Sequence, residues 1–114
     1  MEKWHFGINN DYLVQLVLDG KKTATTSIYN GEKSIIGEES IITYENGQDA
    51  CLVMTTNSIV TEYKNITEEL ALLEGEGDFN KWKEIHNSFF KSIDPSFNDN
   101  TIVEFEIFKV IKKY

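Results

Sequence analysis

The sequence Gly20-Lys21-Lys22-Thr23-Ala24-Thr25-Thr26-Ser27 places two lysines and four hydroxyl side chains directly after a glycine. The residues before it follow a helical pattern, and the β-branched residues within it predict a strand. Hydroxyl and ammonium groups at such a junction are typical of an anion-binding turn or of an activated nucleophile. No other stretch of the chain combines these groups.

A short helix is predicted immediately before this stretch, from about Asp11 to Asp19. The positions that give it the i, i+3, i+4 spacing of an apolar face are Leu13, Leu16 and Val17. Gly20 suits the residue after the helix end, which commonly needs a left-handed conformation. Lys21 and Lys22 then follow the last carbonyl groups, where the helix dipole favours cations. A helix-end charge is therefore the simplest interpretation of these lysines.

The segment from Thr23 to Ile28 is predicted to be a strand, along which side chains alternate between two faces. The more apolar face, which we expect to point into the core, consists of Ala24, Thr26 and Ile28. The opposite face, which we expect to point toward a cleft or water, consists of Thr23, Thr25 and Ser27.

Downstream of a loop over residues 29–38, the sequence predicts a β-hairpin. Its strands cover residues 39–44 and 50–56, and Asn46-Gly47 is a strong turn signal between them. A further strand or edge piece is expected at residues 59–63.

Two helices and a long strand complete the predicted elements. Thr67 and Asp78 suit the N-cap positions of the helices, the second of which covers about residues 79–92. The final strand extends from residue 101 to 112, and its main apolar positions are Ile102, Phe105, Ile107 and Val110. This order indicates an α+β fold in which a small curled sheet or barrel carries helices over its ends.

The composition fits one domain over residues 1–114, because the chain is short and 40% hydrophobic. Cys51, the only cysteine, excludes an intramolecular disulfide and a cysteine-rich zinc site, and its apolar neighbours predict a buried side chain. The formal net charge of −8 disfavours binding to long duplex nucleic acid. The sequence shows no signal peptide or membrane segment, so we expect a soluble cytoplasmic protein.

Lys22 and Thr25 have the chemistry of a nucleophile and its base, since a desolvated lysine can accept a hydroxyl proton. Glu74 follows the apolar residues 71–73, which suggests partial burial, and Lys22 would be its natural partner. The acidic turn 74–78 lacks a recognised calcium pattern. We therefore predict no metal and no cofactor.

With these residues in place, the chain resembles the ASCH domain family, whose fold is PUA-like. The resemblance lies in Gly20-x-Lys22-x-x-Thr25, Trp4-x-Phe6-Gly7, the acidic turn 74–78, Trp82 and His86, and Phe89-Phe90. It implies a small mixed β-barrel with flanking helices. It also implies a cleft lined by the lysine–threonine motif.

The resemblance further implies a role in RNA binding or in hydrolysis of the acetyl amide of N4-acetylcytidine. By motif match, the catalytic roles of the hydrolytic branch fall on Lys22, Thr25 and Glu74. Many members of the family carry an arginine two residues after the motif threonine, whereas this chain has Ser27. The loss of a rigid guanidinium fork puts the identity of the substrate in question.

Three functions follow as hypotheses. The first is an amide hydrolase in which Thr25 attacks, Lys22 takes the proton, and Glu74 orients Lys22 or helps to protonate the leaving amine. Because i and i+3 point to opposite faces of a strand, this pairing requires Lys22 to lie in the turn before the strand. The expected ligand is a small nucleoside-like molecule or a short single-stranded RNA. The residues expected to bind it are Trp4, Phe6, Lys21, Thr23, Ser27, Trp82 and His86.

The second hypothesis is a non-catalytic RNA- or nucleotide-binding module, with Lys21, Lys22 and Lys33 on a phosphate and aromatic side chains stacked on a base. The third is a ribonuclease, for which His5 or His86 would be the first candidates. Sequence patterns do not indicate the oligomeric state.

Overall fold

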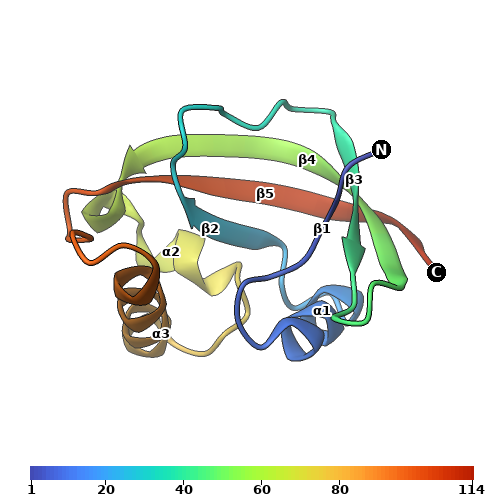
Figure 1. The fold of residues 1–114 in the computed structure, drawn as a ribbon, viewed down its shortest axis with the longest axis horizontal. Helices are drawn as coiled ribbons and strands as arrows, with labels where there is room; N and C mark the ends of the chain where they lie inside the picture. The colour runs from blue at the N-terminus through green and yellow to red at the C-terminus, as the bar shows by residue number, and fades with distance from the viewer.

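A five-stranded mixed sheet with strand order β1-β3-β4-β5-β2 forms the body of the molecule in this computed structural model, which describes residues 1–114. The strands are β1 (Lys3–Trp4), β2 (Ala24–Ile28), β3 (Glu39–Thr43), β4 (Asp49–Glu62) and β5 (Ile102–Lys113). β1 lies parallel to β3, and the other neighbouring strands are antiparallel. The sheet curls strongly along the two long strands β4 and β5 (Figure 1).

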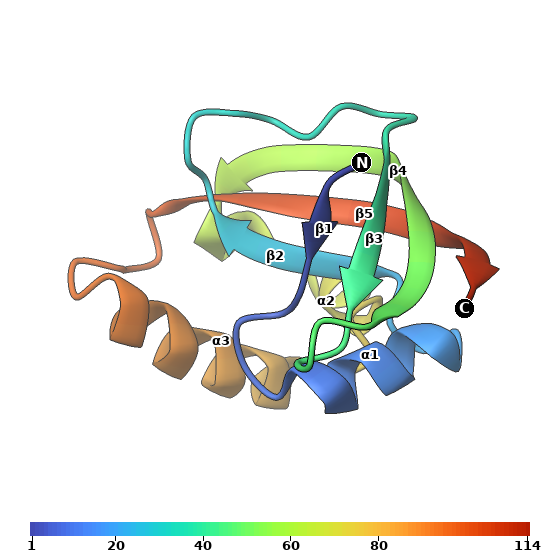
Figure 2. The ribbon, with the colours of Figure 1, turned by 45° about the vertical axis from the view of Figure 1, so that its right-hand side comes forward.

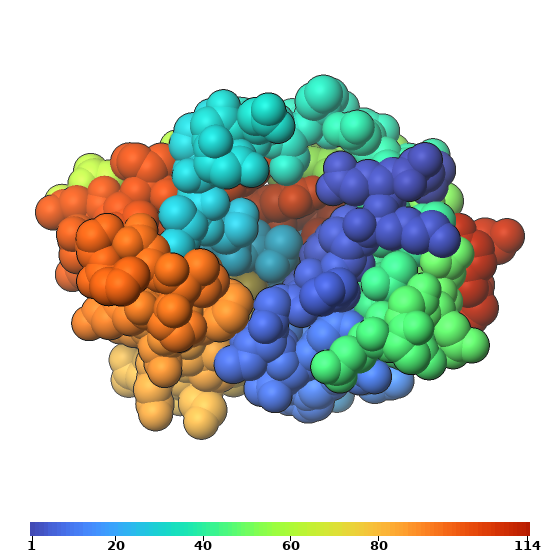
Figure 3. All heavy atoms as spheres, in the orientation of Figure 1, coloured from blue at the N-terminus to red at the C-terminus, as the bar shows by residue number.

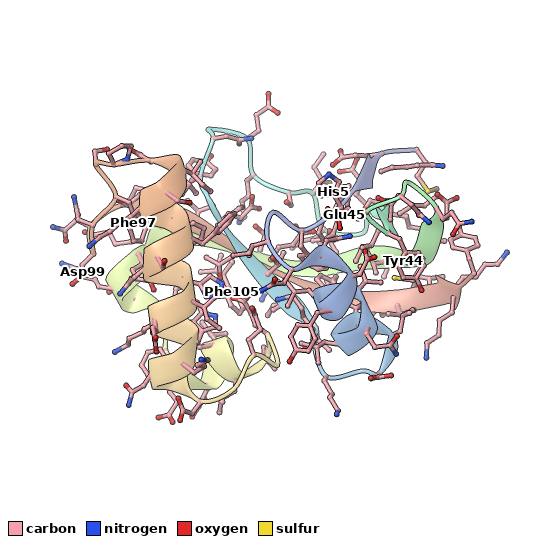
Figure 4. The ribbon with its side chains drawn as sticks, turned by 60° about the horizontal axis from the view of Figure 1, so that its bottom comes forward. His5, Tyr44, Glu45, Phe97, Asp99 and Phe105 are labelled. Carbon is pink, nitrogen blue, oxygen red and sulfur yellow. The ribbon has the colours of Figure 1, made fainter.

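The helices lie on one side of this curled sheet (Figure 2). They are α1 (Asn10–Leu18), α2 (Glu68–Leu72) and α3 (Phe79–Ile93), and a 3₁₀ turn, η1 (Tyr63–Asn65), follows β4. α3 lies under one end of the sheet and α1 under the other, with Phe97 just beyond the C-terminal end of α3 (Figure 4). None of these helices has the length and apolar character needed to cross a membrane. The expected α+β class is confirmed, and the predicted small mixed β-barrel with flanking helices takes the form of this curled five-stranded mixed sheet with its helices.

The turn after α1 follows the predicted glycine stop. Gly20 has a φ of 77°, and its amide donates to the carbonyl of Val17 at 3.0 Å. The amide of Lys21 donates to the carbonyl of Leu16 at 2.9 Å, which completes a Schellman motif. Lys22 therefore lies in the turn, before β2 begins at Ala24.

The other local signals also act as predicted. The side chains of Thr67 and Asp78 accept hydrogen bonds from the amides of Leu70 and Lys81 and so cap α2 and α3. The Asn46-Gly47 turn joins β3 to β4, with a φ of 90° at Gly47.

One expectation about the strands is wrong, and the sequence does not predict β1. Residues 59–62 do not form a separate piece, because β4 continues through them as one strand of 14 residues, and Tyr63 begins η1. Irregularities in the pairing with β5, at Leu52/Val53 and Thr55/Asn57, let this strand bend instead of ending. In β5, Ile102 is exposed, whereas its neighbour Val103 is fully buried. β1 gives no periodic signal in the sequence because it is only two residues long.

Two hydrophobic clusters fill the space between the helices and the sheet. One surrounds α1 and contains Phe6, Val14, Ile42 and the buried Cys51. The other lies around α2 and α3. Its most buried members are Ala24, Ala71, Trp82, Phe90, Val103 and Phe105. Lys22 and Glu74 belong to neither cluster, yet they are among the largest fully buried side chains of the molecule.

Candidate functional site

The ammonium group of Lys22 is buried between two carboxylates. Lys22 Nζ lies 3.0 Å from Glu74 Oε1 and 3.1 Å from Glu76 Oε2. The side chains of Lys22 and Glu74 are each only 1% exposed, and that of Glu76 is 7% exposed. The ring of Phe6 lies 5.2 Å from the same ammonium, within the range of a cation–π contact. Lys22 is therefore fixed in position by charged and aromatic neighbours together.

Glu74 accepts hydrogen bonds or ion pairs from four side chains. Besides Lys22, these are Thr26 Oγ1 at 2.7 Å, Trp82 Nε1 at 2.8 Å and His86 Nε2 at 3.4 Å. Burial by itself would raise the pKa of Glu74, but the charge of Lys22 and the hydrogen bonds from His86 and Thr26 hold it far below its usual range. Glu74 is therefore an ionised carboxylate whose acceptor positions are filled by the protein.

A glycine between the two acids allows both to reach the same ammonium. Gly75 has a φ of 71°, and a Cβ atom at this position would collide with the backbone carbonyl of Lys21. The chain after α2 can approach the turn after α1 this closely only because residue 75 has no side chain. In the same region the amide of Thr23 donates to the carbonyl of Leu73 at 2.8 Å, which ties the end of α2 to the start of β2.

His86 is oriented by hydrogen bonds at both ring nitrogens. Nδ1 lies 2.8 Å from the carbonyl oxygen of Trp82, which only accepts, so Nδ1 carries a hydrogen. Nε2 faces Glu74, and the ring stacks on Trp82 with centroids 4.4 Å apart. Burial lowers the pKa of His86, but the hydrogen bond and charge of Glu74 outweigh it, and the net shift is upward. Because Nδ1 holds the hydrogen of a neutral ring, Nε2 donates to Glu74 when His86 is protonated, the form that this upward shift favours.

The side chains around Lys22 include the residue types that bind metal ions, but the group between them is the lysine ammonium. Side-chain atoms of Glu74, Glu76 and His86 lie within 4.8 Å of one another, close enough to bind one metal ion. Lys22 Nζ already bonds both carboxylates. A divalent ion between them would have to displace a buried positive charge, so the arrangement favours an internal ion pair over a metal centre.

Of the two hydroxyl side chains that line a small cavity beside Lys22, Thr25 and Thr26, only that of Thr25 forms no hydrogen bond. It is half-buried and forms no side-chain hydrogen bond, in contrast to Thr26. A cavity of about 60 Å³ brings Thr25 together with Lys22 and Glu74. The other side chains that line this small cavity include Phe6, Thr26, Glu76, His86 and Phe89. Lys22 lies in the turn, as its predicted pairing with Thr25 requires, but its hydrogen bonds go to Glu74 and Glu76 and not to Thr25.

A second, larger cavity of about 630 Å³ adjoins the small one. Both are lined by Phe6, Gly7, Thr25, Thr26 and Phe89. Figure 3 shows a hollow at this place, bordered by the N-terminal segment, the loop after β2 and the end of α3, with β5 visible in its depth. Two carboxylates of β5, Glu104 and Glu106, line this large cleft. The two cavities together form a cleft that narrows toward Lys22.

The remaining residues expected to bind a ligand fall into three groups. Trp4 and Ser27 line the large cleft together with Phe6. Trp82 and His86 lie in the hydrogen-bond network of Glu74. Lys21 and Thr23 line neither cavity, because Lys21 is exposed and the Thr23 hydroxyl turns to the carbonyl of Leu73 at 3.3 Å.

Sequence reasoning missed four polar side chains of this region. Thr26 lies on the core face, as the sequence predicts, but its hydroxyl donates a hydrogen bond to Glu74 there. The sequence indicates Glu76 only as part of an acidic turn. The Glu-Gly-Glu spacing is the signal that could have indicated two acids on one cation. Glu104 and Glu106 alternate with apolar residues of β5, and nothing local marks them as lining a cleft.

Comparisons with known proteins agree on one family. The family model for the ASCH domain matches residues 2–112. No curated protein matches the chain. An ASCH domain from Lactobacillus crispatus JV V101 is 26% identical, with a TM-score of 0.88 over 96% of this chain and 78% of its own. A crystallised protein from Enterococcus faecalis V583 is also 26% identical, with a TM-score of 0.90 over 100% of this chain and 78% of its own.

A more distant structure shares the fold alone. A mutant form of an ASCH protein from Zymomonas mobilis is 8% identical, with a TM-score of 0.61 over 99% of this chain and 72% of its own.

Proposed function

This chain belongs to the ASCH domain family, and from that premise we propose that it hydrolyses the amide bond of a small nucleoside-like substrate of the N4-acetylcytidine type. The observation that carries the proposal is the small cavity in which an unpartnered threonine hydroxyl, Thr25, meets the ion pair of Lys22 and Glu74. A nucleophile beside a desolvated amine, with the amine held by a third group, is the arrangement that acyl transfer requires.

In the first step, Thr25 Oγ attacks the carbonyl carbon of the amide. Its proton passes to Lys22 Nζ as Lys22 passes a proton to Glu76. Glu76 suits this exchange, because burial raises its pKa, Lys22 partly offsets the rise and Glu74 adds to it. The C–N bond then breaks, the leaving nitrogen takes the proton back through Lys22, and the acyl group remains on Thr25 as an ester.

In the second step, a water molecule attacks this ester and gives a proton to Lys22 as Lys22 again passes one to Glu76. The ester bond breaks, Thr25 Oγ takes a proton from Lys22, which recovers one from Glu76, and the acyl group leaves as a carboxylic acid. Glu74 takes no proton in either step, because its four partners and its low pKa keep it ionised. Its role is to position Lys22.

The test compares two threonines of the same segment. Thr25→Val removes the proposed nucleophile without breaking any hydrogen bond, whereas Thr23→Val removes a hydroxyl that points away from the cavity. With N4-acetylcytidine as substrate, we expect kcat to fall by at least about 10³-fold in Thr25→Val and to change little in Thr23→Val. Equal activity of both variants would remove Thr25 from the mechanism, and an inactive wild type would refute the substrate.

The same assay separates the two rival functions. A non-catalytic RNA- or nucleotide-binding module would bind a short single-stranded RNA with an affinity that falls steeply with salt and would release no product. A ribonuclease would cleave that RNA, and its activity would depend on His5 or His86. His5 is exposed and lines the large cleft, whereas His86 lines the small cavity.

A further inference from the structure

The floor of the large cleft carries two carboxylates with no cation to neutralise them. Glu104 is 7% exposed, and Glu106 is half-buried on the same face of β5. Glu104 Oε2 accepts from the amide of Ser34 at 2.7 Å and from the hydroxyl of Ser58. Thr55 Oγ1 donates to Glu106 at 2.6 Å. All of these donors are uncharged, and neither carboxylate forms a salt bridge.

Keeping two such groups away from water is costly unless something else binds them. Buried acids are normally paired with a cation or carry a function. Both hydrogen bonds to Glu104 go to Oε2, which leaves Oε1 without a protein donor. Burial raises the pKa of Glu106, and the neighbouring charge of Glu104 adds to the rise after the Thr55 hydroxyl has partly offset it. The cleft therefore offers acceptor oxygens to a ligand.

The rest of the cleft lining has the same sign of charge. Its acidic residues are Glu2, Glu32, Glu38, Glu39, Glu104 and Glu106, and its only lysine is Lys33. A concave surface lined by one sign of charge focuses its electric field on whatever enters. A phosphate group would be repelled from this cleft, whereas N–H and O–H donors would be attracted.

The pairing of β2 with β5 connects this cleft to the proposed nucleophile. In the register of the two strands, Glu106 lies opposite Thr25, and Glu104 lies opposite Ser27. Thr25 also lines both cavities. A ligand part that bonds Glu106 in the large cleft can therefore present an amide to Thr25 at the entrance of the small cavity.

We infer that Glu104 and Glu106 form a specificity site that binds the donor groups of an unphosphorylated substrate and excludes phosphorylated ones. The inference rests on the proposed amide hydrolysis and adds the substrate class. The ligand is a free nucleoside-type amide, whose hydroxyl and N–H groups suit carboxylate acceptors, and not a nucleotide or an RNA strand.

The experiment measures kcat/KM for N4-acetylcytidine and for its 5′-monophosphate. We expect wild type to prefer the nucleoside by about tenfold or more at low salt, and the preference to shrink at high salt as the repulsion is screened. Equal kcat/KM for the two substrates would overturn the specificity site and leave the hydrolase proposal standing. If neither compound is hydrolysed, the hydrolase proposal itself fails, and the inference fails with it.

Two isosteric variants make the result specific to the cleft. Glu106→Gln removes one charge and keeps an oxygen that can accept from Thr55, so we expect the preference to fall about threefold or more. Glu45→Gln removes the same charge from the exposed hairpin, where Figure 4 labels Glu45, and this residue lines neither cavity. If the two variants change the preference equally, net charge and not the cleft explains it, and the specificity site is refuted.

Discussion

The buried carboxylate of Glu74 and the cleft carboxylates Glu104 and Glu106 show two opposite ways of keeping an acid out of water. Glu74 is surrounded by a lysine, a histidine and two neutral donors, and its pKa is lowered. Glu106 has a neutral hydroxyl partner and an acidic neighbour, and its pKa is raised. The first arrangement fixes a side chain in place, whereas the second leaves acceptor capacity for a ligand. Burial alone thus does not reveal the role of a carboxylate. The hydrogen-bond donors around it determine whether it is ionised and whether it can still bind a ligand.

The largest effect is expected from an isosteric change at Glu74. Glu74→Gln leaves the shape intact but removes half of the charge that neutralises buried Lys22, so we expect a loss of about 3–5 kcal/mol in the free energy of unfolding. Glu106→Gln makes the same atomic change where no cation is lost, and it should cost less than about 1 kcal/mol. Urea unfolding of both variants measures the difference. Equal losses of unfolding free energy would show that Glu74 and Glu106 do not differ in how much their charge contributes to stability.

The packing around Glu74 can also be disrupted by a substitution that changes no charged residue. Gly75 and Gly20 have similar φ angles of 71° and 77°, but a Cβ atom at residue 75 would collide with the carbonyl of Lys21, whereas residue 20 has open space. Gly20→Ala should cost about 1 kcal/mol through backbone strain alone. Gly75→Ala should cost about 2–4 kcal/mol, because the acidic turn must move away from Lys22. Thermal unfolding compares the two, and equal shifts would argue against close packing of the turns.

Neighbouring threonines test whether the donors to Glu74 stabilise the protein. Thr26→Val removes a hydrogen bond to a buried charge, and we expect a loss of about 1.5–3 kcal/mol. Thr25→Val removes no hydrogen bond and should change the free energy of unfolding by less than about 0.5 kcal/mol. Chemical unfolding of this pair also supplies the folding control for the activity assay. The interpretation of Thr25 as a free hydroxyl fails if its replacement costs as much as that of Thr26.

The smallest effect is expected in the pH dependence of stability, where the two carboxylates act in opposite directions. Glu74 has a lowered pKa, so its contribution is present above the ordinary value of 4.5 and is lost as the pH falls below it. Glu106 has a raised pKa, so the folded state keeps a proton that the unfolded chain has released. Its contribution falls as the pH rises from 4.5 through the folded pKa.

Melting temperatures between pH 4.5 and 7 measure the Glu106 contribution. Relative to wild type, Glu106→Gln should become progressively more stable across this range, because the variant has no carboxylate to ionise. Glu45→Gln serves as the control at an exposed position. A difference between wild type and Glu106→Gln that does not change with pH would show that Glu106 ionises normally in the folded protein.

The sequence by itself determined the local framework of this protein. Gly20, the Asn46-Gly47 turn and the caps Thr67 and Asp78 act through atoms within a few residues of themselves, so their effects follow from neighbouring positions. The motif that contains Lys22 and Thr25 is local for the same reason, since its residues lie in one turn and one strand.

Only the tertiary structure decided what each polar side chain meets. Glu74 contacts Thr26 across 48 positions of the chain, and Ser58 meets Glu104 across 46. β4 continues through residues 59–62 because β5 pairs with it along its length, and no local sequence signal indicates this pairing. The charge state and the availability of a buried group depend on donors brought from distant elements. The difference between the fixed carboxylate of Glu74 and the open carboxylates of the cleft therefore arises only on folding.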